Sequence, residues 1–526
     1  MSVFGEKLRA AAPEPAGRRW LFVPYDQLSD RVGPLSREKP RDLGIVLVET
    51  RWKPAQRRYH RQKLALVLAS QRHFALEQAA RGVAVRYVVG EKPYAALLAP
   101  LVAELGALRA MTPAERELRA DLAPLVEEGA LELLPHEGWL TTRKDFEHAT
   151  RGKRWRMDAF YRRVRRRTGI LMENGLPLGG KLSFDTENRK PWRGEPPAPA
   201  PPRYRRDAVK AEVAAFVTEA FAAHPGRVDL DALPATQRDA EALWRWAKRE
   251  CLPSFGPYED AMSARSAGLF HTRIAPLLNN LRLLPARVVA DVAALELPLS
   301  SREGFIRQVL GWREFVRHVH ETTDGFRRLP DGSESPRDAA GAASPSSLGA
   351  DRPLPPAFWG ERSGLACLDA VVADVWRDAW SHHITRLMVL ANLATLLDVS
   401  PRALTDWFWV AYLDAYDWVV EPNVLGMGTF ALGDLFTTKP YVSGAAYVDR
   451  MSDYCGGCRF SPQRDCPVTP LYWAFLARHR RRLAGNPRLA LPLRSLARRS
   501  PKQRADDARV FARASAALAE GRELVP

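Results

Sequence analysis

The chain has 526 residues, of which 46% are hydrophobic and 26% are charged, a balance typical of globular proteins rather than disordered or fibrous ones. This length exceeds one domain of roughly 150 residues and suits two or three. No apolar run reaches the ~20 residues that a membrane span needs. Five cysteines are too few for a disulfide framework, and the N-terminus does not look like a secretory signal. We therefore expect a cytoplasmic protein with no membrane contact.

The charge balance bears on the partner. Lys and Arg number 78 against 61 Asp and Glu, so the formal net charge is +17. A strongly basic balance favours a polyanionic partner such as nucleic acid. A GC-rich genome that places arginine wherever a solvated cation is tolerated explains the same excess, so charge alone leaves both interpretations open.

Residues 1–144 alternate short apolar segments with longer amphipathic ones. This β-α-β rhythm predicts a Rossmann-like α/β domain with a parallel sheet and helices on both faces. No G-x-G-x-x-G follows the first segment, so the ordinary dinucleotide fingerprint is absent. The predicted strands are Trp20–Pro24, Leu43–Glu49, Val83–Val89, Leu108–Met111 and Leu131–Leu134, and the predicted helices are Arg61–Ala80, Tyr94–Leu105 and Pro113–Glu128.

Residues 145–206 are predicted to form a basic connector. Arg151–Arg167 holds nine basic residues and one acid, interleaved with Trp155, Phe160 and Tyr161. Basic side chains bind phosphates, and rings between them stack on bases. A solvated helix face whose rings dock on the core explains the pattern equally well. The proline-rich stretch Glu195–Pro202 cannot form a helix or a central strand.

Residues 207–500 show a hydrophobic period of 3.6, which predicts a large all-α domain. The loop Leu329–Pro356, rich in Gly, Ser, Pro and Asp, interrupts it. Residues 501–526 are expected to form a C-terminal helical tail. The clearest predicted helices are Thr236–Trp246, Phe305–His320, Leu368–Leu397 and Pro401–Ala415.

Three cysteines, Cys455, Cys458 and Cys466, lie within twelve residues in a segment rich in Gly and Pro. This spacing lets two sulfurs face one metal while the third closes from the next turn. The fourth ligand must come from elsewhere, and Cys367 and Cys251 are the remaining thiols. Four thiolates suit zinc or an iron–sulfur cluster, and spacing alone does not separate the two.

Several longer motifs occur in order along nearly the whole chain. Together they resemble the iron–sulfur bacterial cryptochromes and (6-4) photolyases, also called deoxyribodipyrimidine photolyase-related proteins. The resemblance implies a cryptochrome/photolyase architecture, with an α/β antenna-binding domain and a helical domain that encloses U-shaped FAD. The motifs are Asp26-Gln27-Leu28, Arg72-His73-Phe74, Gly311-Trp312-Arg313-Glu314, His382-His383-Ile-Thr-Arg386, Pro422-Asn423, Lys439-Pro440-Tyr441 and Arg450-Met-Ser-Asp-Tyr-Cys455.

The resemblance implies light-driven repair of (6-4) pyrimidine–pyrimidone photoproducts in UV-damaged DNA, single- or double-stranded, by electron transfer from reduced FAD. A damaged, poorly stacked base is the cheapest to flip out of the duplex. His383, with His382 adjacent, would supply a proton, because imidazole is protonated near neutral pH. The alternative within the family is a cryptochrome-type blue-light receptor with little or no repair. A zinc-containing nucleic-acid module is disfavoured, since it gives no reason for the Trp-Arg-Glu and His-His motifs.

The resemblance also assigns site residues and implies a monomer that associates with the nucleoid when bound to DNA. The lesion pocket would be formed by His382, His383, Tyr441 and Tyr447, and the damaged strand would be held by Arg189 and Lys190. FAD would contact His271, Thr272, Trp312, Arg313, Glu314, Arg386 and Asn423. A 6,7-dimethyl-8-ribityllumazine antenna would lie by Asp26 and Glu49. Electrons would pass through Trp407 and Trp359, and a 4Fe–4S cluster would be held by Cys367, Cys455, Cys458 and Cys466.

Some positions depart from the family pattern. Phe408 stands where the family often has tyrosine, and phenylalanine is far harder to oxidise, so an electron path through it is closed. Ala275 replaces a hydroxyl residue in the phosphate-binding turn. Val420 replaces a carboxylate near flavin N5, and Glu421, one residue on, is rotated by about 100° on a helix. Lys53 replaces an acid at the antenna rim. Most other tryptophans are expected to be packing residues.

Overall fold

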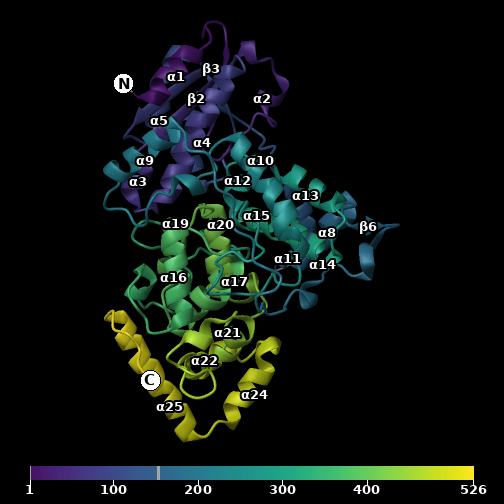
Figure 1. Ribbon diagram of the computed structural model, residues 1–526, viewed down its shortest axis with the longest axis vertical. Helices are drawn as coiled ribbons and strands as arrows, with labels where there is room; N and C mark the ends of the chain where they lie inside the picture. The colour runs from purple at the N-terminus through teal and green to yellow at the C-terminus, as the bar shows by residue number, and fades with distance from the viewer. Residues whose placement is uncertain (1, 151–154) are drawn as a thin grey trace.

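The computed structural model describes residues 2–150 and 155–526. Figure 1 shows an elongated molecule with the α/β part at the N-terminal end, helices through the rest, and the last helices at the opposite end. The predicted basic run Arg151–Arg167 is described from residue 155 onward, and residues 151–154 lie outside the described residues.

Five strands form one parallel sheet in the order β3-β2-β1-β4-β5. This order, in which the chain winds outward from the first strand to either side, is that of a doubly wound α/β domain. All eight residues of β2 are buried, as expected for a strand covered on both faces. The predicted fold class is therefore confirmed. The strands are β1 (Arg19–Phe22), β2 (Leu43–Thr50), β3 (Ala84–Gly90), β4 (Leu108–Met111) and β5 (Leu131–Leu134).

Alternating side chains of the central strands enter two separate cores. In β2, Ile45 and Leu47 pack with Phe74 of α4 (Arg61–Ala80). The intervening Val46 and Val48 pack on the other side with α5 (Tyr94–Leu105) and α6 (Arg116–Glu127). A period of two in a strand turns neighbouring residues to opposite faces, so this pattern explains the helical layers on either side of the sheet.

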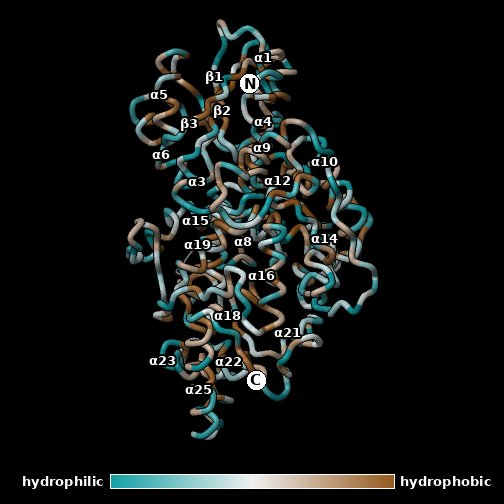
Figure 2. Tube along the Cα trace, turned by 60° about the vertical axis from the view of Figure 1, so that its left-hand side comes forward, coloured by the Kyte–Doolittle hydropathy of each residue, from teal (hydrophilic) through white to brown (hydrophobic). Residues whose placement is uncertain are grey.

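The helical part follows, and its hydrophobic stretches lie mainly inside while hydrophilic ones lie at the periphery (Figure 2). None of the helices in the described ranges is both long and apolar enough to cross a bilayer. Its principal helices are α8 (Met157–Thr168), α9 (Ala208–Ala220), α10 (Gln237–Trp246), α11 (Leu252–Phe255), α12 (Ala275–Asn279), α13 (Pro285–Ala294), α14 (Leu299–Ile306), α15 (Glu314–Thr322), α16 (Ala366–Asp378), α17 (His383–Thr385), α18 (Asn392–Leu396), α19 (Pro401–Ala411), α20 (Asp417–Glu421), α21 (Ala445–Met451), α22 (Val468–Arg478), α24 (Ala490–Arg498) and α25 (Pro501–Ala519).

The single helix predicted over Leu368–Leu397 is wrong. Helix α16 ends at Asp378, and Ala379 caps it with φ of 51° while its N–H donates to the Val375 carbonyl at 2.8 Å. The chain then runs extended and turns helical again at His383. Both pieces bury apolar residues in one core, which is why the periodicity continues across the break. The break places His382 and His383 at the start of a helix instead of its middle.

Four helical segments of the described residues widen into π-type turns, Ala247–Cys251, Arg307–Arg313, Arg386–Ala391 and Pro422–Gly428. Such turns are rare overall and frequent at functional sites. The last three contain residues that the family resemblance assigns to the flavin, and the first does not. These three turns therefore mark one candidate region before any cavity is considered.

The C-terminal tail is docked onto the helical part. Ser500 and Gln503 form a capping box at the start of α25, and Phe511 is buried beneath the Arg478 guanidinium. Beyond the helix, the Leu524 N–H donates to the Ser363 carbonyl at 2.9 Å. The tail therefore closes over the part of the molecule that carries α16 and α22.

Candidate functional site

The helical part encloses a cavity of about 1050 Å³, measured to its mouth. Aromatic side chains cover much of its wall and polar groups enter at a few points, as in pockets that bind planar cofactors. Ala275, where the family has a hydroxyl, also lies on this wall. Of the residues that the resemblance assigns to FAD, those on the wall are His271, Thr272, Trp312, Arg313, Arg386 and Asn423.

Arg313 presents a buried guanidinium to the cavity. It donates to the Leu278 carbonyl at 3.1 Å and lies over the Trp139 ring with Cζ 4.4 Å from the centroid. Its Nε has no hydrogen-bond partner. Burial lowers the pKa of Arg313 to about 10, so the group stays charged at neutral pH. A buried cation with a spare N–H suits an anionic ligand such as a phosphate.

Glu314 lies away from the cavity wall. Its fully buried carboxylate accepts the backbone N–H groups of Leu140 and Thr141 at 3.0 Å and the Thr141 hydroxyl at 2.8 Å. It also accepts a bond from Arg313 at 3.2 Å. Glu314 therefore positions Arg313 and ties α15 to the segment after the sheet, instead of touching the cavity directly.

Arg386 is fixed at the wall by Asp414. Two guanidinium nitrogens donate to the two Asp414 oxygens at 3.0 Å each, and Nε donates to the Ser381 carbonyl at 2.8 Å. Such a bidentate pair has little orientational freedom. The Tyr412 ring lies under the guanidinium, with Cζ 4.1 Å from the centroid. This pair holds the extended segment before His382 in place.

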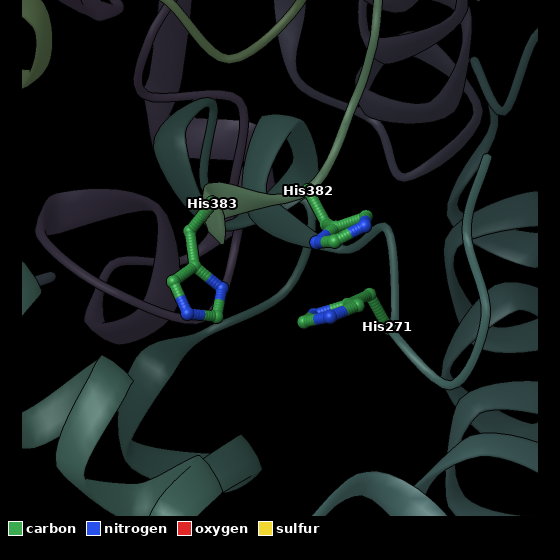
Figure 3. A group of neighbouring side chains, drawn as sticks. All are labelled: His271, His382 and His383. Carbon is green, nitrogen blue, oxygen red and sulfur yellow. The ribbon is translucent and has the colours of Figure 1, made fainter. Parts of the chain in front are cut away.

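Three histidines meet at one side of the cavity (Figure 3). The rings of His271 and His382 stack with centroids 4.3 Å apart and planes 9° from parallel, and the His383 ring lies 5.3 Å from His271 at 69°. Burial lowers the pKa of His271 and of His382 well below the ordinary value, and that of His383 below it. The stacked pair is therefore neutral near pH 7. His383 keeps 42% of its side chain exposed.

The nitrogens of these three rings lie within 4.8 Å of one another, the spacing of a metal site. The lone pair of an imidazole nitrogen lies in the plane of its ring. Two planes stacked nearly parallel at 4.3 Å cannot both contain one ion, so the stacked pair does not form a chelate. The cluster is better suited to packing against a planar ligand.

Residues assigned to the lesion and to DNA gather around Asp260. The His383 Nε2 lies 3.9 Å from one Asp260 oxygen, and the Arg189 Nε lies 3.7 Å from the other. Burial, with Glu259 and Asp185 nearby, raises the pKa of Asp260 to about 7. Burial and then the charge of Asp260 raise the pKa of Tyr447. No sequence motif pointed to Asp260, because it comes close to His383 only through folding.

Tyr441 lies among charged groups of the same region. Burial raises its pKa, and the charges that act on it are those of Asp185, Arg189, Arg488 and Arg156. Arg189 is 52% exposed, and Lys190 is exposed beside it. The structure thus brings both tyrosines close to the connector cation Arg189.

Cys367, Cys455, Cys458 and Cys466 line one small cavity of about 350 Å³, although Cys367 is 88 residues from Cys455 in sequence. Its other walls are mostly apolar, including Leu365, Val448 and Phe460. Burial, the Asp449 carboxylate and the neighbouring thiols raise the pKa of Cys455 to about 12. Cys251 lies apart, fully buried, with its thiol 3.7 Å from the His271 carbonyl.

A second cavity, of about 700 Å³, lies where the sheet meets the helical part. Its walls include the rings of Tyr25 and Tyr416, stacked at 6.3 Å and 17°. Lys53 donates to the Tyr25 hydroxyl at 2.8 Å and forms an ion pair with Glu115. Lys63 donates to backbone carbonyls, including that of Trp409 at 2.7 Å.

The antenna-assigned acids differ in their environments. Glu49 lines the second cavity but is paired with Arg72 at 2.8 Å and accepts the Tyr87 hydroxyl at 2.7 Å. Asp26 is 1% exposed, and neither carboxylate oxygen has a hydrogen-bond partner. Burial raises the pKa of Asp26 to about 6. Asp26 is not among the residues that line this cavity, so Glu49 is the antenna-assigned acid that the structure places on its wall.

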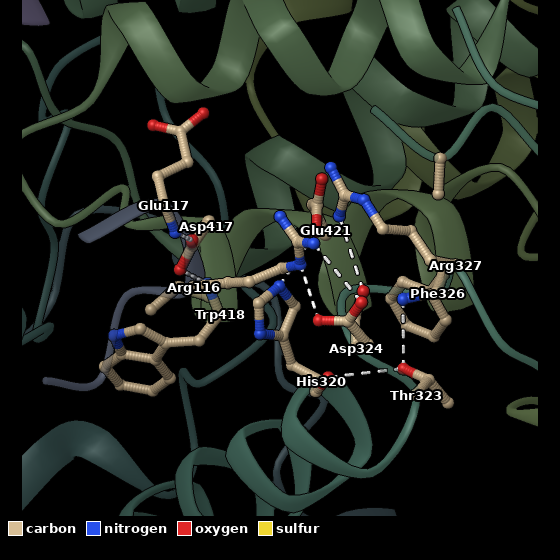
Figure 4. Close-up of polar contacts among 12 residues, drawn as sticks. Arg116, Glu117, His320, Thr323, Asp324, Phe326, Arg327, Asp417, Trp418 and Glu421 are labelled. Carbon is tan, nitrogen blue, oxygen red and sulfur yellow. Dashed lines mark hydrogen bonds and ion pairs between the residues drawn. The ribbon is translucent and has the colours of Figure 1, made fainter. Parts of the chain in front are cut away.

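The displaced acid Glu421 is not among the residues that line the cavity, and Figure 4 shows it close to His320. Its carboxylate accepts from Arg402 at 2.8 Å and lies 2.8 Å from the His320 Nε2. Burial acts to raise the pKa of Glu421, but these two partners outweigh it and the pKa is lowered. Val420 is buried in the core, and Val419 lines the cavity. The wall at this point is apolar, but the residue on it is Val419 and not Val420, the position expected near the flavin.

A doubly wound α/β domain followed by a helical domain with such a cavity is the arrangement of photolyases and cryptochromes. The structure is similar to a bacterial class III photolyase from Agrobacterium tumefaciens, with a TM-score of 0.54 and 15% identity over 97% of this chain and 99% of that one. It is also similar to a cryptochrome from Synechocystis sp. PCC6803, with a TM-score of 0.51 and 15% identity over 79% of this chain and 83% of that one.

The sequence narrows the class. A (6-4) photolyase of Agrobacterium fabrum is 32% identical over 503 residues, which cover 91% of this chain and 96% of that protein. The family profile described as deoxyribodipyrimidine photo-lyase-related protein matches residues 21–232. The chain belongs to the deoxyribodipyrimidine photolyase-related family.

Proposed function

We propose that this protein uses light and reduced FAD to repair (6-4) photoproducts in UV-damaged DNA. The observation that carries the proposal is the position of His383 on the wall of the large cavity, 42% exposed and beside the groups assigned to the flavin. A base flipped out of a duplex must enter a pocket of this kind. Such a base would meet the His383 imidazole as it approached the flavin.

The cavity residues suit FAD. When bound, FAD supplies the photoexcited electron donor. Arg313, with its unpaired Nε, would pair with an anionic part of the cofactor, and Trp312 and Asn423 would line its ring system. The neutral stacked pair of His271 and His382 offers a flat, uncharged surface.

The proton chemistry rests on His383. Its lowered pKa means that the protonated form becomes abundant only below pH 6.5. Asp260, with a pKa raised to about 7 and an oxygen 3.9 Å away, can hold a proton next to Nε2 at neutral pH. Repair by the reduced enzyme should therefore become faster as the pH falls from the alkaline side towards 6.5.

DNA would dock on the face that carries Arg189, Lys190, Tyr441 and Tyr447. Exposed cations neutralise phosphates and rings pack against an extruded base. The net charge of +17 supports the same partner.

We further propose that Cys367, Cys455, Cys458 and Cys466 hold a 4Fe–4S cluster. Bonds of about 2.3 Å to one zinc ion would draw the sulfurs to within about 4 Å of one another. Within the part of the chain that the structure describes, only the three histidines meet a 4.8 Å limit for three or more such ligands. The wider cysteine spacing supports a cluster over a single zinc ion.

For the second cavity we propose a lumazine-type antenna held by the aromatic walls, with Glu49 on the wall and Asp26 next to the lining residue Tyr25 in the chain. Lys53 keeps its ammonium paired with Glu115. We therefore expect weaker antenna binding than in relatives that have an acid at this position.

A blue-light receptor is the second candidate. The observation that favours it is the apolar wall at Val419, with Glu421 bonded to Arg402 and not on the wall, because a missing carboxylate changes flavin protonation without requiring DNA. Phe408 adds to this departure.

The deciding experiment uses oligonucleotides that carry a (6-4) lesion. We expect the purified protein to show flavin bands and a broad cluster absorption, and to repair the lesion under blue light after chemical reduction. His383→Ala should reduce the repair rate by about a hundredfold or more, since positioned proton transfer contributes that much. The control is His148→Ala, an exposed histidine bonded to the Lys144 carbonyl. Normal flavin content without any repair would favour the receptor.

A further inference from the structure

The tryptophans assigned to electron transfer are joined by a third one. The Trp376 ring on α16 stacks on Trp359 with centroids 5.5 Å apart and planes 18° from parallel, and meets Trp407 edge-on at 6.0 Å and 86°. Trp376 and Trp407 also share a hydrogen-bond acceptor, because both indole N–H groups donate to the Phe358 carbonyl, at 3.0 and 2.9 Å. The three indoles are therefore held in sequence by packing and by one backbone carbonyl.

The row runs from the buried core next to the cavity to the surface. Trp407 is 1% exposed and contacts the Tyr412 ring at 6.0 Å. The Tyr412 hydroxyl lies 2.9 Å from that of Ser381, which lines the large cavity. At the other end, Trp359 is 50% exposed. A buried start, a half-buried middle and an exposed end are what a path between an enclosed cofactor and a reductant in solution requires.

We propose that Trp376 is the middle relay through which electrons from outside reach the flavin cavity. It takes the relay role that Phe408 cannot fill in this chain, because phenylalanine is far harder to oxidise. The inference rests on the proposed function, since the electron that leaves Trp407 goes to the oxidised, photoexcited flavin. Trp376 then donates one electron to the oxidised Trp407, and Trp359 donates one electron to the oxidised Trp376. A thiol in solution finally reduces Trp359, and two oxidised thiols combine as a disulfide.

The hydrogen bonds give this row a direction. A backbone carbonyl is a very weak base, so an oxidised Trp407 or Trp376 keeps its indole proton and remains a radical cation that its neighbour can reduce. Trp359, half exposed to water, can release its proton there and regains it when the thiol donates an electron and a proton. The oxidised state is therefore stabilised on Trp359 at the surface, far from the cavity, which disfavours back electron transfer from the cavity.

The surroundings of Trp376 include the ring of His60, which suits a relay role for this tryptophan. Its ring stacks on Trp376 at 5.8 Å and 6°. The His60 Nδ1 accepts the Gln62 N–H at 3.0 Å, so the proton is on Nε2, which faces the Trp376 carbonyl at 3.1 Å. Burial lowers the pKa of His60 to about 4. At neutral pH the ring is uncharged and adds no positive charge against an oxidised Trp376.

The test measures flavin photoreduction in the loaded, full-length protein with a thiol reductant under blue light. In Trp376→Phe we expect the rate of flavin photoreduction to fall by about tenfold or more, because phenylalanine is a poor electron donor. A tenfold change corresponds to only a modest increase in the barrier. Flash absorption should show the long-lived tryptophan radical of the wild type lost or shortened. The control is Trp473→Phe on α22, whose ring contacts Tyr472 and Arg499.

Two readouts separate this inference from the proposed function. Flavin content and repair after chemical reduction should be unchanged in Trp376→Phe, since neither needs the relay. Photoreduction at the wild-type rate in that variant would overturn the relay and leave the repair function intact. Should Trp376→Phe fold poorly, Trp359→Phe alters only the exposed end, and an undiminished photoreduction rate there would equally overturn the path.

Discussion

The cavity of the helical part and the cavity beside the sheet differ in how their charges are satisfied. In the cavity of the helical part, the Arg313 Nε and the ring nitrogens His271 Nε2 and His382 Nδ1 are buried without partners. In the cavity beside the sheet, Lys53 is paired with Glu115 and Lys63 donates to backbone carbonyls. The first has donors free for a ligand, while the second is largely neutralised from within.

This difference indicates where ligand binding contributes to folding. Buried polar groups without partners are costly, so a ligand that satisfies them stabilises the folded state through its affinity. The helical cavity should therefore retain its cofactor through purification. The cavity beside the sheet, with its internal ion pairs, should remain folded without an antenna and exchange it readily.

The first prediction tests whether Glu421, which lies next to the helical cavity, contributes to flavin binding or only to the stability of the fold. Glu421→Gln should lower the free energy of unfolding by about 2 kcal/mol at neutral pH, because the buried Arg402 keeps its ion pair with Asp406 but loses the charge of Glu421. Flavin content at low temperature should stay normal. Since the pKa of Glu421 is lowered, its stabilisation is present above about pH 4.3 and is lost as the pH falls through the folded-state value.

Denaturant unfolding of wild type and variant across this pH range measures the effect. The difference between the two proteins should shrink as the solution becomes acidic. A variant of normal stability that loses flavin would instead place Glu421 in the cofactor site. Asp158→Asn, in the first turn of α8, is a control for changing an acid elsewhere.

The second prediction concerns the free donors of the helical cavity. Arg313→Met should cost about 2 kcal/mol of flavin binding, the value of a hydrogen bond to a charged group, or roughly thirtyfold in dissociation constant. The flavin-to-protein ratio after gel filtration measures it. Arg165→Met is the matched control, because Arg165 is 1% exposed and donates to the carbonyls of Leu171 and Leu182 away from the cavity. Equal loss of flavin in both variants would show a general folding defect.

Much of this structure follows from short-range patterns. Alternation of apolar residues predicted the strands, and β2 begins at Leu43 as expected. The helix break at Ala379 escaped prediction because apolar periodicity continues through it, and the segment after it is held by a pair distant in sequence, Arg386 with Asp414. Asp260 and Trp376 carry no motif, since each gains its meaning from neighbours far along the chain. The candidate site was therefore predictable where motifs contain it and unpredictable where packing assembles it.

The last prediction would make the second cavity resemble the first. In Lys53→Glu, the Tyr25 hydroxyl loses the donor that now occupies it, and a carboxylate replaces a cation at the rim. We expect 6,7-dimethyl-8-ribityllumazine to bind about tenfold more tightly, measured by fluorescence titration of flavin-loaded protein. The nearby Glu115, already raised in pKa by burial and by Asp417, would lose its partner and bind a proton, while Glu117, 3.7 Å from the Lys53 ammonium, would keep its ion pair with Arg57. Lys39→Glu, at an exposed position, is the control. Equal affinity in all three proteins would mean that Glu49, Asp26 and the aromatic walls alone decide antenna binding, and that internal pairing does not distinguish the two cavities.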